Sequence, residues 1–180
     1  MTLKQRKEAF LTLGSYLRND FHIDFSEKIH EVTIKNPWFI KNNIKSALDN
    51  WVNQLDSDMF DAWLNPYQIN EIIIPKKVLI IMAGNIPLVG FHDFLSVVVS
   101  GHNVVIKLSS NDNVLMPAVI NKLIDICPSL NNNIEFIDEV KDRSFDAVIA
   151  TGNNNSARYF DYYFKDTQKI LRKNRRSVAV

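Results

Sequence analysis

The sequence predicts an α/β fold in which a doubly wound, mostly parallel β-sheet follows an N-terminal helical region. Three observations predict it. Short, continuous apolar runs recur in the later part of the chain, helical stretches alternate with these runs, and the earlier part shows helical spacing alone. With 180 residues, 46% of them hydrophobic, the chain is long enough to bury a sizeable core.

Residues 1–67 form the predicted helical region. Their apolar side chains recur every three or four residues, which places them on one side of a helix. The two clearest stripes are Phe10, Leu13 and Leu17, and then Ile44, Leu48, Trp51 and Leu55. Asn36 and Pro37 suit a helix cap followed by a first helical position. Asp56 or Ser57 suits the cap of a further short helix.

Residues 68–180 form the predicted α/β domain, with its boundary near Pro66 to Pro75. Continuous apolar strands are typical of parallel sheets that are covered on both faces. The expected strands are Val78 to Met82, Val104 to Leu108, Ile134 to Ile137, Ala147 to Ala150 and Ser177 to Val180. Helices are expected at about 88–100, 114–126 and 155–165. No helix follows the last predicted strand, so we expect the domain to be truncated.

Charge and cysteine content exclude several classes of protein. Lys and Arg number 21 against 20 Asp and Glu, so the net charge of +1 favours a small ligand over nucleic acid. Cys127 is the single cysteine and no apolar leader opens the chain, so we expect a cytoplasmic protein. The longest apolar run, Ile86 to Val99, is interrupted by polar residues and is too short for a membrane span.

Three polar loops follow predicted strands, at residues 83–88, 107–112 and 151–155. Ligands bind at the carboxyl ends of parallel strands, so we expect Asn85, Lys107 and Gly152 to share one cleft. The Asn85 amide suits donation to a developing oxyanion, with a plain helix cap as the alternative. Lys107 closes an apolar strand, and its ammonium either meets a ligand or extends into solvent. The glycines of these loops, as an alternative, merely turn the chain.

Several common motifs are absent from the sequence. No G-x-G-x-x-G and no G-K-[ST] occurs, which argues against a standard dinucleotide fold and a P-loop. The four histidines lack the paired spacing and cysteine partners of a zinc site, so no metal site is predicted. Cys127 lies in an apolar setting without a nearby base and is interpreted as an inert packed thiol.

The loop motifs resemble those of the aldehyde dehydrogenase superfamily. Residues 82–88 (MAGNIPL), the predicted helix end at 100–102 (SGH) and residues 103–109 (NVVIKLS) match its pattern N-x-P-L, then small-x-G-N-x-V-V-x-K-P-S. The form Gly-Asn-Ile-Pro-Leu-Val-Gly, with a later Ala-Thr-Gly and a basic run at 172–176, is most similar to LuxC-type acyl-CoA reductases. The resemblance is strong over residues 76–180 and loose over the N-terminal helices. It implies that this chain is the cofactor-binding portion, with residues 68–180 as a nucleotide-binding α/β domain that is truncated before the catalytic domain.

The resemblance implies NAD(P)H-dependent reduction of an acyl-CoA, or another acyl thioester, to an aldehyde. It implies that Asn85 is the oxyanion amide and that Lys107 holds the adenosine ribose. Cofactor contacts are implied for the remaining motif residues, namely Gly84, Pro87, Ser109, Ser110, Thr151 and Gly152. Ser110 stands where NAD-preferring relatives carry a glutamate, which favours NADPH, with NADH as the alternative. Acyl-CoA would be the substrate of the full-length enzyme, and a homo-oligomer is left open.

The sequence also departs from the family's pattern. Leu108 replaces the usual proline, and Arg172 to Arg175 replaces Glu-Leu-Gly-Gly, whose glutamate acylating relatives also lack. The family's catalytic cysteine belongs to a later domain, and Cys127 is in the wrong place to replace it. The chain alone is therefore not expected to turn over. The alternatives are a non-catalytic regulatory or assembly module and a short-chain acylating aldehyde dehydrogenase.

Overall fold

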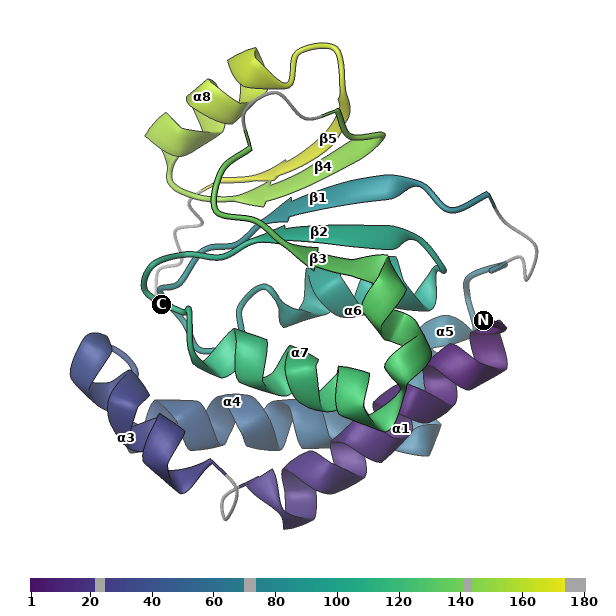
Figure 1. The fold of residues 1–180 in the computed structure, drawn as a ribbon, viewed down its shortest axis with the longest axis vertical. Helices are drawn as coiled ribbons and strands as arrows, with labels where there is room; N and C mark the ends of the chain where they lie inside the picture. Colours follow the sequence, from purple (N-terminus) through teal and green to yellow (C-terminus); the bar gives the residue numbers. More distant parts are fainter. Residues whose placement is uncertain (22–24, 70–73, 141–143, 174–180) are drawn as a thin grey trace, which may run out of the picture.

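A five-stranded, fully parallel sheet forms the centre of the protein. The computed structural model describes residues 1–21, 25–69, 74–140 and 144–173. The strands lie in the order β3-β2-β1-β4-β5, so the chain starts in the middle and builds outward on both sides (Figure 1). They are β1 (Lys77–Ile81), β2 (Asn103–Lys107), β3 (Ile134–Phe136), β4 (Ala147–Thr151) and β5 (Gln168–Arg172).

Helices cover both faces of the sheet. Alternate residues of each strand point to opposite faces: Val78 and Ile80 of β1 pack into one buried cluster, and Leu79 and Ile81 into another. Figure 1 shows α8 on one face and the other helices on the opposite face. The helices are α1 (Leu3–Asn19), α3 (Ser26–Lys35), α4 (Lys41–Gln54), α5 (Ser57–Leu64), α6 (Phe91–Val99), α7 (Leu115–Ile126) and α8 (Asn154–Tyr163), with a 3-10 helix at Pro128–Asn133. The predicted doubly wound α/β fold and its N-terminal helical region are confirmed.

The helical region shares its core with the α/β part. Phe10 of α1 lies 6.3 Å, centroid to centroid, from Phe60 of α5 and also from Phe91 of α6, and 6.2 Å from Phe94. All four rings are fully buried. The guanidinium of Arg6 adds a buried hydrogen bond from Nε to the carbonyl of Val99 at 2.9 Å. The predicted boundary at residue 68 therefore separates two parts that are packed against each other.

The structure differs from the sequence-based expectations in three places. Asn36 and Pro37 do not open a helix: Asn36 is the C-cap of α3, and the next helix begins at Lys41. α6 begins at Phe91 instead of 88, because turns occupy residues 86–90. β5 is a strand that the sequence patterns did not predict. The strand expected at Ser177 to Val180 lies outside the described residues.

The prediction that Asp56 caps a short helix is correct. Its carboxylate accepts a hydrogen bond from the backbone N–H of Asp58, at the start of α5. Across the described parts of the chain, no helix combines the length and the apolar character needed to cross a bilayer.

Candidate functional site

The loops after β1, β2 and β4 meet at the carboxyl edge of the sheet. Ile81 is in register with Lys107 on one side and Ala150 on the other. The first two loops are in direct contact: a Cβ added to Gly84 would lie 2.6 Å from the hydroxyl oxygen of Ser109. Only glycine allows that approach. The buried Gly84 is thus explained by packing between two loops of the site.

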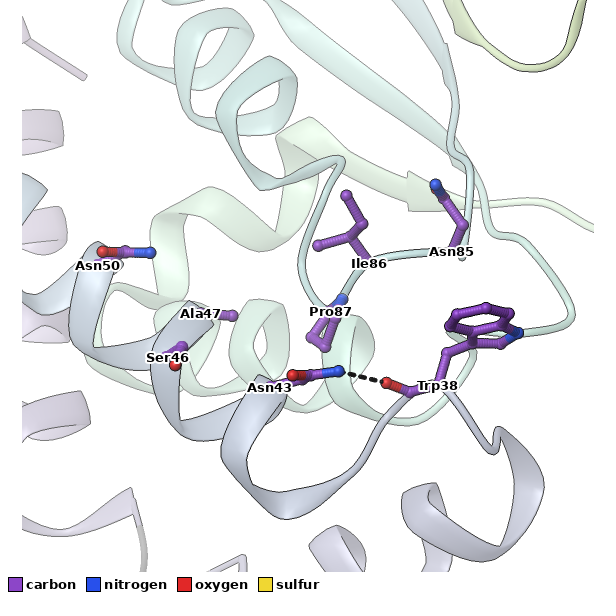
Figure 2. A pocket seen from close by; sticks show the side chains of 8 residues that line it. All are labelled: Trp38, Asn43, Ser46, Ala47, Asn50, Asn85, Ile86 and Pro87. Atoms are coloured by element: carbon purple, nitrogen blue, oxygen red, sulfur yellow. Dashed lines mark hydrogen bonds between the residues drawn. The ribbon is translucent and has the colours of Figure 1, made fainter. Parts of the chain in front are cut away.

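A hollow of about 600 Å³ lies between the loop after β1 and helix α4. We call it the Asn85 hollow; it is lined by Trp38, Asn43, Ser46, Ala47, Asn50, Asn85, Ile86 and Pro87. Figure 2 shows the α4 side chains along one wall, facing the loop that carries Asn85. Asn85 and Ile86 are exposed, whereas Pro87 is buried. An amide donor therefore stands beside a space open to a ligand.

A second hollow, of about 290 Å³, lies on the opposite face of the sheet beneath α8. We call it the Lys107 hollow; it is lined by Ile81, Lys107, Asp138, Glu139, Val140, Tyr159, Phe160, Tyr163 and Phe164. Lys107 points to this face because it alternates with Ile106, which packs on the other face. Tyr159 and Tyr163 stack at 5.9 Å and give the hollow an aromatic wall. Asp138 and Glu139 are exposed carboxylates at its rim.

The structure brings the three predicted loops to one edge but divides their side chains. Asn85 lines one hollow and Lys107 lines the other. The prediction that they share a single cleft is therefore wrong: the two hollows lie on opposite faces of the sheet. Thr151 ends β4, and the N–H of Gly152 donates to the carbonyl of Arg172 at 3.1 Å. Gly152 and Thr151 line neither hollow.

The serines of the loop after β2 lie beside the Lys107 strand end. Ser109 is half-buried, and its hydroxyl accepts a hydrogen bond from the N–H of Asn111 at 3.2 Å. Ser110 is exposed. Ser109 therefore braces its own loop, and Ser110 is free to face a ligand.

A buried carboxylate supports the far end of the Asn85 loop. Asp112, 5% exposed, accepts hydrogen bonds from the backbone N–H of Leu88 at 3.2 Å and of Met116 at 3.3 Å. Leu88 adopts a φ of 59°, a left-handed conformation that a leucine holds only when its surroundings enforce it. Burial raises the pKa of Asp112 to about 6, although both backbone hydrogen bonds act in the other direction.

Asn36 supports the near end of the same loop. It is 4% exposed, and its amide nitrogen donates to the carbonyl of Gly84 at 3.2 Å. Sequence reasoning missed both supports. Asn36 looked like a helix cap, and Asp112 was only one residue of a polar loop, because no local pattern reports a contact made between distant segments.

At the end of β5, the guanidinium of Arg172 forms an ion pair with Asp93 of α6 at 2.6 Å. Asp93 is 3% exposed, so the arginine neutralises a buried carboxylate. Arg172 stands where the resemblance expects a glutamate. Its partner, Asp93, lies on the helix that follows the Asn85 loop, so the arginine has a structural role.

The single cysteine lies far from this edge in the fold. Cys127 lies between α7 and the 3-10 helix that leads into β3, and its sulfur is 3.3 Å from the hydroxyl of Ser129. Among the residues that the structure describes, no three His, Cys, Asp or Glu side chains gather in a group that could hold a metal ion. The site therefore offers amide, ammonium, hydroxyl and aromatic groups.

Solved aldehyde dehydrogenases have a similar fold. A double mutant of betaine aldehyde dehydrogenase from Staphylococcus aureus, in complex with NAD+, has a TM-score of 0.69 at 15% identity, covering 97% of this chain and 39% of that one. The NAD-dependent benzaldehyde dehydrogenase from Corynebacterium glutamicum has a TM-score of 0.65 at 14% identity, covering 97% of this chain and 42% of that one. Glyceraldehyde-3-phosphate dehydrogenase GapN from Methanocaldococcus jannaschii, complexed with NADP, has a TM-score of 0.57 at 13% identity, covering 95% of this chain and 46% of that one.

The chain spans less than half the length of these dehydrogenases. A comparison with curated protein sequences finds no significant match. The sequence does match the family described as acyl-CoA reductase (LuxC), over residues 19–171. Since that match covers most of the chain, including both hollows, the chain belongs to the LuxC family of acyl-CoA reductases.

Proposed function

We propose that the protein carrying this chain reduces an acyl-CoA, or a related acyl thioester, to an aldehyde. The chain supplies the cofactor-binding half, and the cysteine that takes the acyl group lies in another region. The observation that carries the proposal is the pair of hollows at one sheet edge, one with the Asn85 amide and one with the Lys107 ammonium. Parallel sheets bind ligands at this edge.

The Lys107 hollow fits the adenosine end of a nicotinamide cofactor. Its volume of about 290 Å³ is near the lower end of small-molecule sites, roughly 300 to 1,000 Å³. The stacked rings of Tyr159 and Tyr163 offer a flat apolar wall to an adenine. The Lys107 ammonium and the carboxylates of Asp138 and Glu139 can donate to and accept from ribose hydroxyls.

We propose NADPH as the preferred cofactor, with NADH as the alternative. The support is Ser110, an exposed hydroxyl at the position where a ribose-binding carboxylate would exclude a 2′-phosphate. The exposed carboxylates of Asp138 and Glu139 act in the opposite direction, since they repel a phosphate. Among the similar dehydrogenases, one is complexed with NAD+ and another with NADP, so relatives of this fold use both forms.

The Asn85 hollow fits the acyl end of the reaction. When bound, the cofactor supplies a hydride to the acyl carbon. The side-chain amide of Asn85 donates a hydrogen bond to the acyl oxygen as negative charge develops on it. Trp38, 74% exposed, and Ile86, 55% exposed, are apolar surfaces at the same hollow that can cover an acyl chain and keep water from the thioester.

We also propose that the protein is cytoplasmic and works on small molecules, with a homo-oligomer left open.

Titration of the chain with NADPH and NADH, followed by calorimetry, tests the cofactor proposal. We expect saturable binding of both forms, with NADPH tighter. A folded sample that binds neither form contradicts the cofactor-binding role, and tighter binding of NADH contradicts the NADPH preference alone. The activity is tested in the complete natural protein by supplying an acyl-CoA and NADPH and measuring free CoA and aldehyde.

A further inference from the structure

Asn36 lies where three segments meet: the loop after β1, the loop after β2 and the segment that leads to α4. Its side-chain nitrogen donates to the carbonyl of Gly84 at 3.2 Å and to the carbonyl of Asn111 at 3.0 Å. Its side-chain oxygen accepts from the N–H of Trp38 at 3.0 Å. Both hydrogens and the oxygen of one buried amide are therefore used, and each connects to a different segment.

We infer that Asn36 is a positioning residue that orients the side chain of Asn85. The carbonyl of Gly84 and the N–H of Asn85 belong to one planar peptide group. A hydrogen bond that holds the Gly84 oxygen therefore holds the plane of this peptide group, and with it the nitrogen and Cα of Asn85 from which the side chain leaves the loop. This inference rests on the role proposed above for Asn85.

The loop is held at its other end as well. The N–H of Leu88 donates to Asp112, and the left-handed φ of Leu88 turns the chain into α6. Between these two supports stand only Asn85, Ile86 and Pro87, and the proline ring restricts its own φ. With both ends held and the proline restricting itself and the residue before it, few backbone conformations remain for Asn85. An oxyanion donor is effective when it is held in place before the reaction.

Asn36 also holds the backbone of Trp38, a second residue that lines the Asn85 hollow. The N–H of Trp38 is bound by Asn36, and the carbonyl of Trp38 accepts from the side chain of Asn43 at 2.9 Å (Figure 2). The backbone of Trp38 is thus held from both sides, with its indole at the hollow. Neither Asn36 nor Trp38 lines the Lys107 hollow, and Asn36 reaches the loop that carries Ser110 only through the carbonyl of Asn111. Loss of Asn36 should therefore lower turnover by a larger factor than it weakens cofactor binding.

Replacement of Asn36 by aspartate isolates the effect. Asn36→Asp keeps the size of the side chain and the oxygen that accepts from Trp38, but it removes both donated hydrogen bonds. The matched control is Asn133→Asp, which removes a similar bond to the side-chain oxygen of Asn103, 2.6 Å long, at the opposite end of β2.

The first measurement uses the 180-residue chain itself and needs no activity. The side-chain amide resonances of Asn85 are recorded by ¹⁵N NMR and assigned by their loss in Asn85→Asp. We expect Asn36→Asp to shift or broaden them and Asn133→Asp to leave them in place. Unchanged Asn85 resonances in a folded Asn36→Asp sample overturn the inference.

The second measurement is a double-mutant cycle on turnover in the complete natural protein. We expect Asn36→Asp to lower kcat by about 10- to 100-fold, with the KM for NADPH changed less than about twofold. In an Asn85→Ala background the same substitution should have no further effect on kcat, because it acts through the missing amide. An equal loss in both backgrounds shows a merely structural role and overturns the inference. If Asn85→Ala alone leaves kcat unchanged, the proposed function of Asn85 fails, and the NMR result still decides the positioning.

Discussion

Lys107 is the residue on which the cofactor proposal depends most directly. Its ammonium lines the hollow under α8, between the aromatic wall and two carboxylates. We expect Lys107→Ala to weaken NADPH binding by about tenfold, since a hydrogen bond from a charged group contributes roughly 1.5 kcal/mol or more. Calorimetric titration measures the change.

The matched control for this substitution is Lys77→Ala. Lys77 is also a lysine at a strand end, but it lies at the amino end of β1, where its ammonium is 3.5 Å from the carboxylate of Glu135. We expect it to leave NADPH affinity unaltered. Equal affinities of wild type and Lys107→Ala remove the lysine from the binding site.

Asp112 gives the protein a pH-dependent stability. Burial raises its pKa from 3.8 to about 6, so the folded protein holds this proton more tightly than the unfolded chain. Its contribution to stability is complete below about pH 4 and is lost as the pH rises through about 6. The loss amounts to about 2 to 3 kcal/mol, at 1.36 kcal/mol for each pKa unit.

Urea unfolding of wild type and Asp112→Asn across this pH range measures the effect. Asn has no carboxyl group to titrate, so the free energy of unfolding of the wild type should fall relative to the variant between about pH 4 and pH 7. Parallel curves for the two proteins contradict the assignment of a raised pKa to Asp112.

Residues of the site could be predicted from the sequence only where a local motif carries them. Lys107 is the last residue of one apolar strand, and Asn85 lies in the loop after another. Their place at the carboxyl edge of the sheet therefore follows from the parallel topology. The division into two hollows depends on which face each side chain meets. Asn36 lies 48 residues from Gly84 and 75 from Asn111 along the chain, and no pattern within one segment reports such a contact.

At the scale of elements, β5 shows where pattern reading fails. The strand is Gln168–Arg172, and its central Ile170 is 56% exposed. It lies at the edge of the sheet beside β4 and carries only two apolar residues, so the continuous apolar run that identified the inner strands is missing. Its strand conformation comes from backbone pairing with β4, which the sequence pattern does not encode.

The ion pair between Arg172 and Asp93 attaches this edge strand to α6. Asp93 is buried, whereas the side chain of Arg172 is 37% exposed and can reach water. We expect Arg172→Met to destabilise the protein by about 3 kcal/mol, because it removes the cation that neutralises a buried carboxylate. Asp93→Asn should cost about 1 kcal/mol, because the freed guanidinium is hydrated.

The order of the two effects is the test. Urea unfolding at neutral pH gives the free energy of unfolding for each variant. A larger loss for Asp93→Asn than for Arg172→Met contradicts the view that desolvation of the carboxylate dominates this pair.

At the scale of the whole molecule, the helical region and the sheet should unfold as one unit. The buried rings of Phe10, Phe60, Phe91 and Phe94 join α1, α5 and α6 in one cluster, so the helical region has no core apart from the one it shares with the α/β part. All three tryptophans lie within residues 1–67, so their fluorescence reports on the helical region, whereas far-UV circular dichroism reports on the whole chain. We expect the two probes to give coincident urea transitions.

Phe10→Ala should shift both transitions together. Its ring is fully buried between the two parts, and truncation of a buried phenylalanine costs about 3 to 5 kcal/mol. Ile34→Ala, at a side chain that is 70% exposed, is the control and should move neither transition by much. If Phe10→Ala lowers the fluorescence transition and leaves a separate dichroism transition at the wild-type midpoint, the two parts are independent. Coincident shifts mean that contacts made by the N-terminal helices, including the support that Asn36 gives to the Asn85 loop, depend on the same folding equilibrium as the sheet.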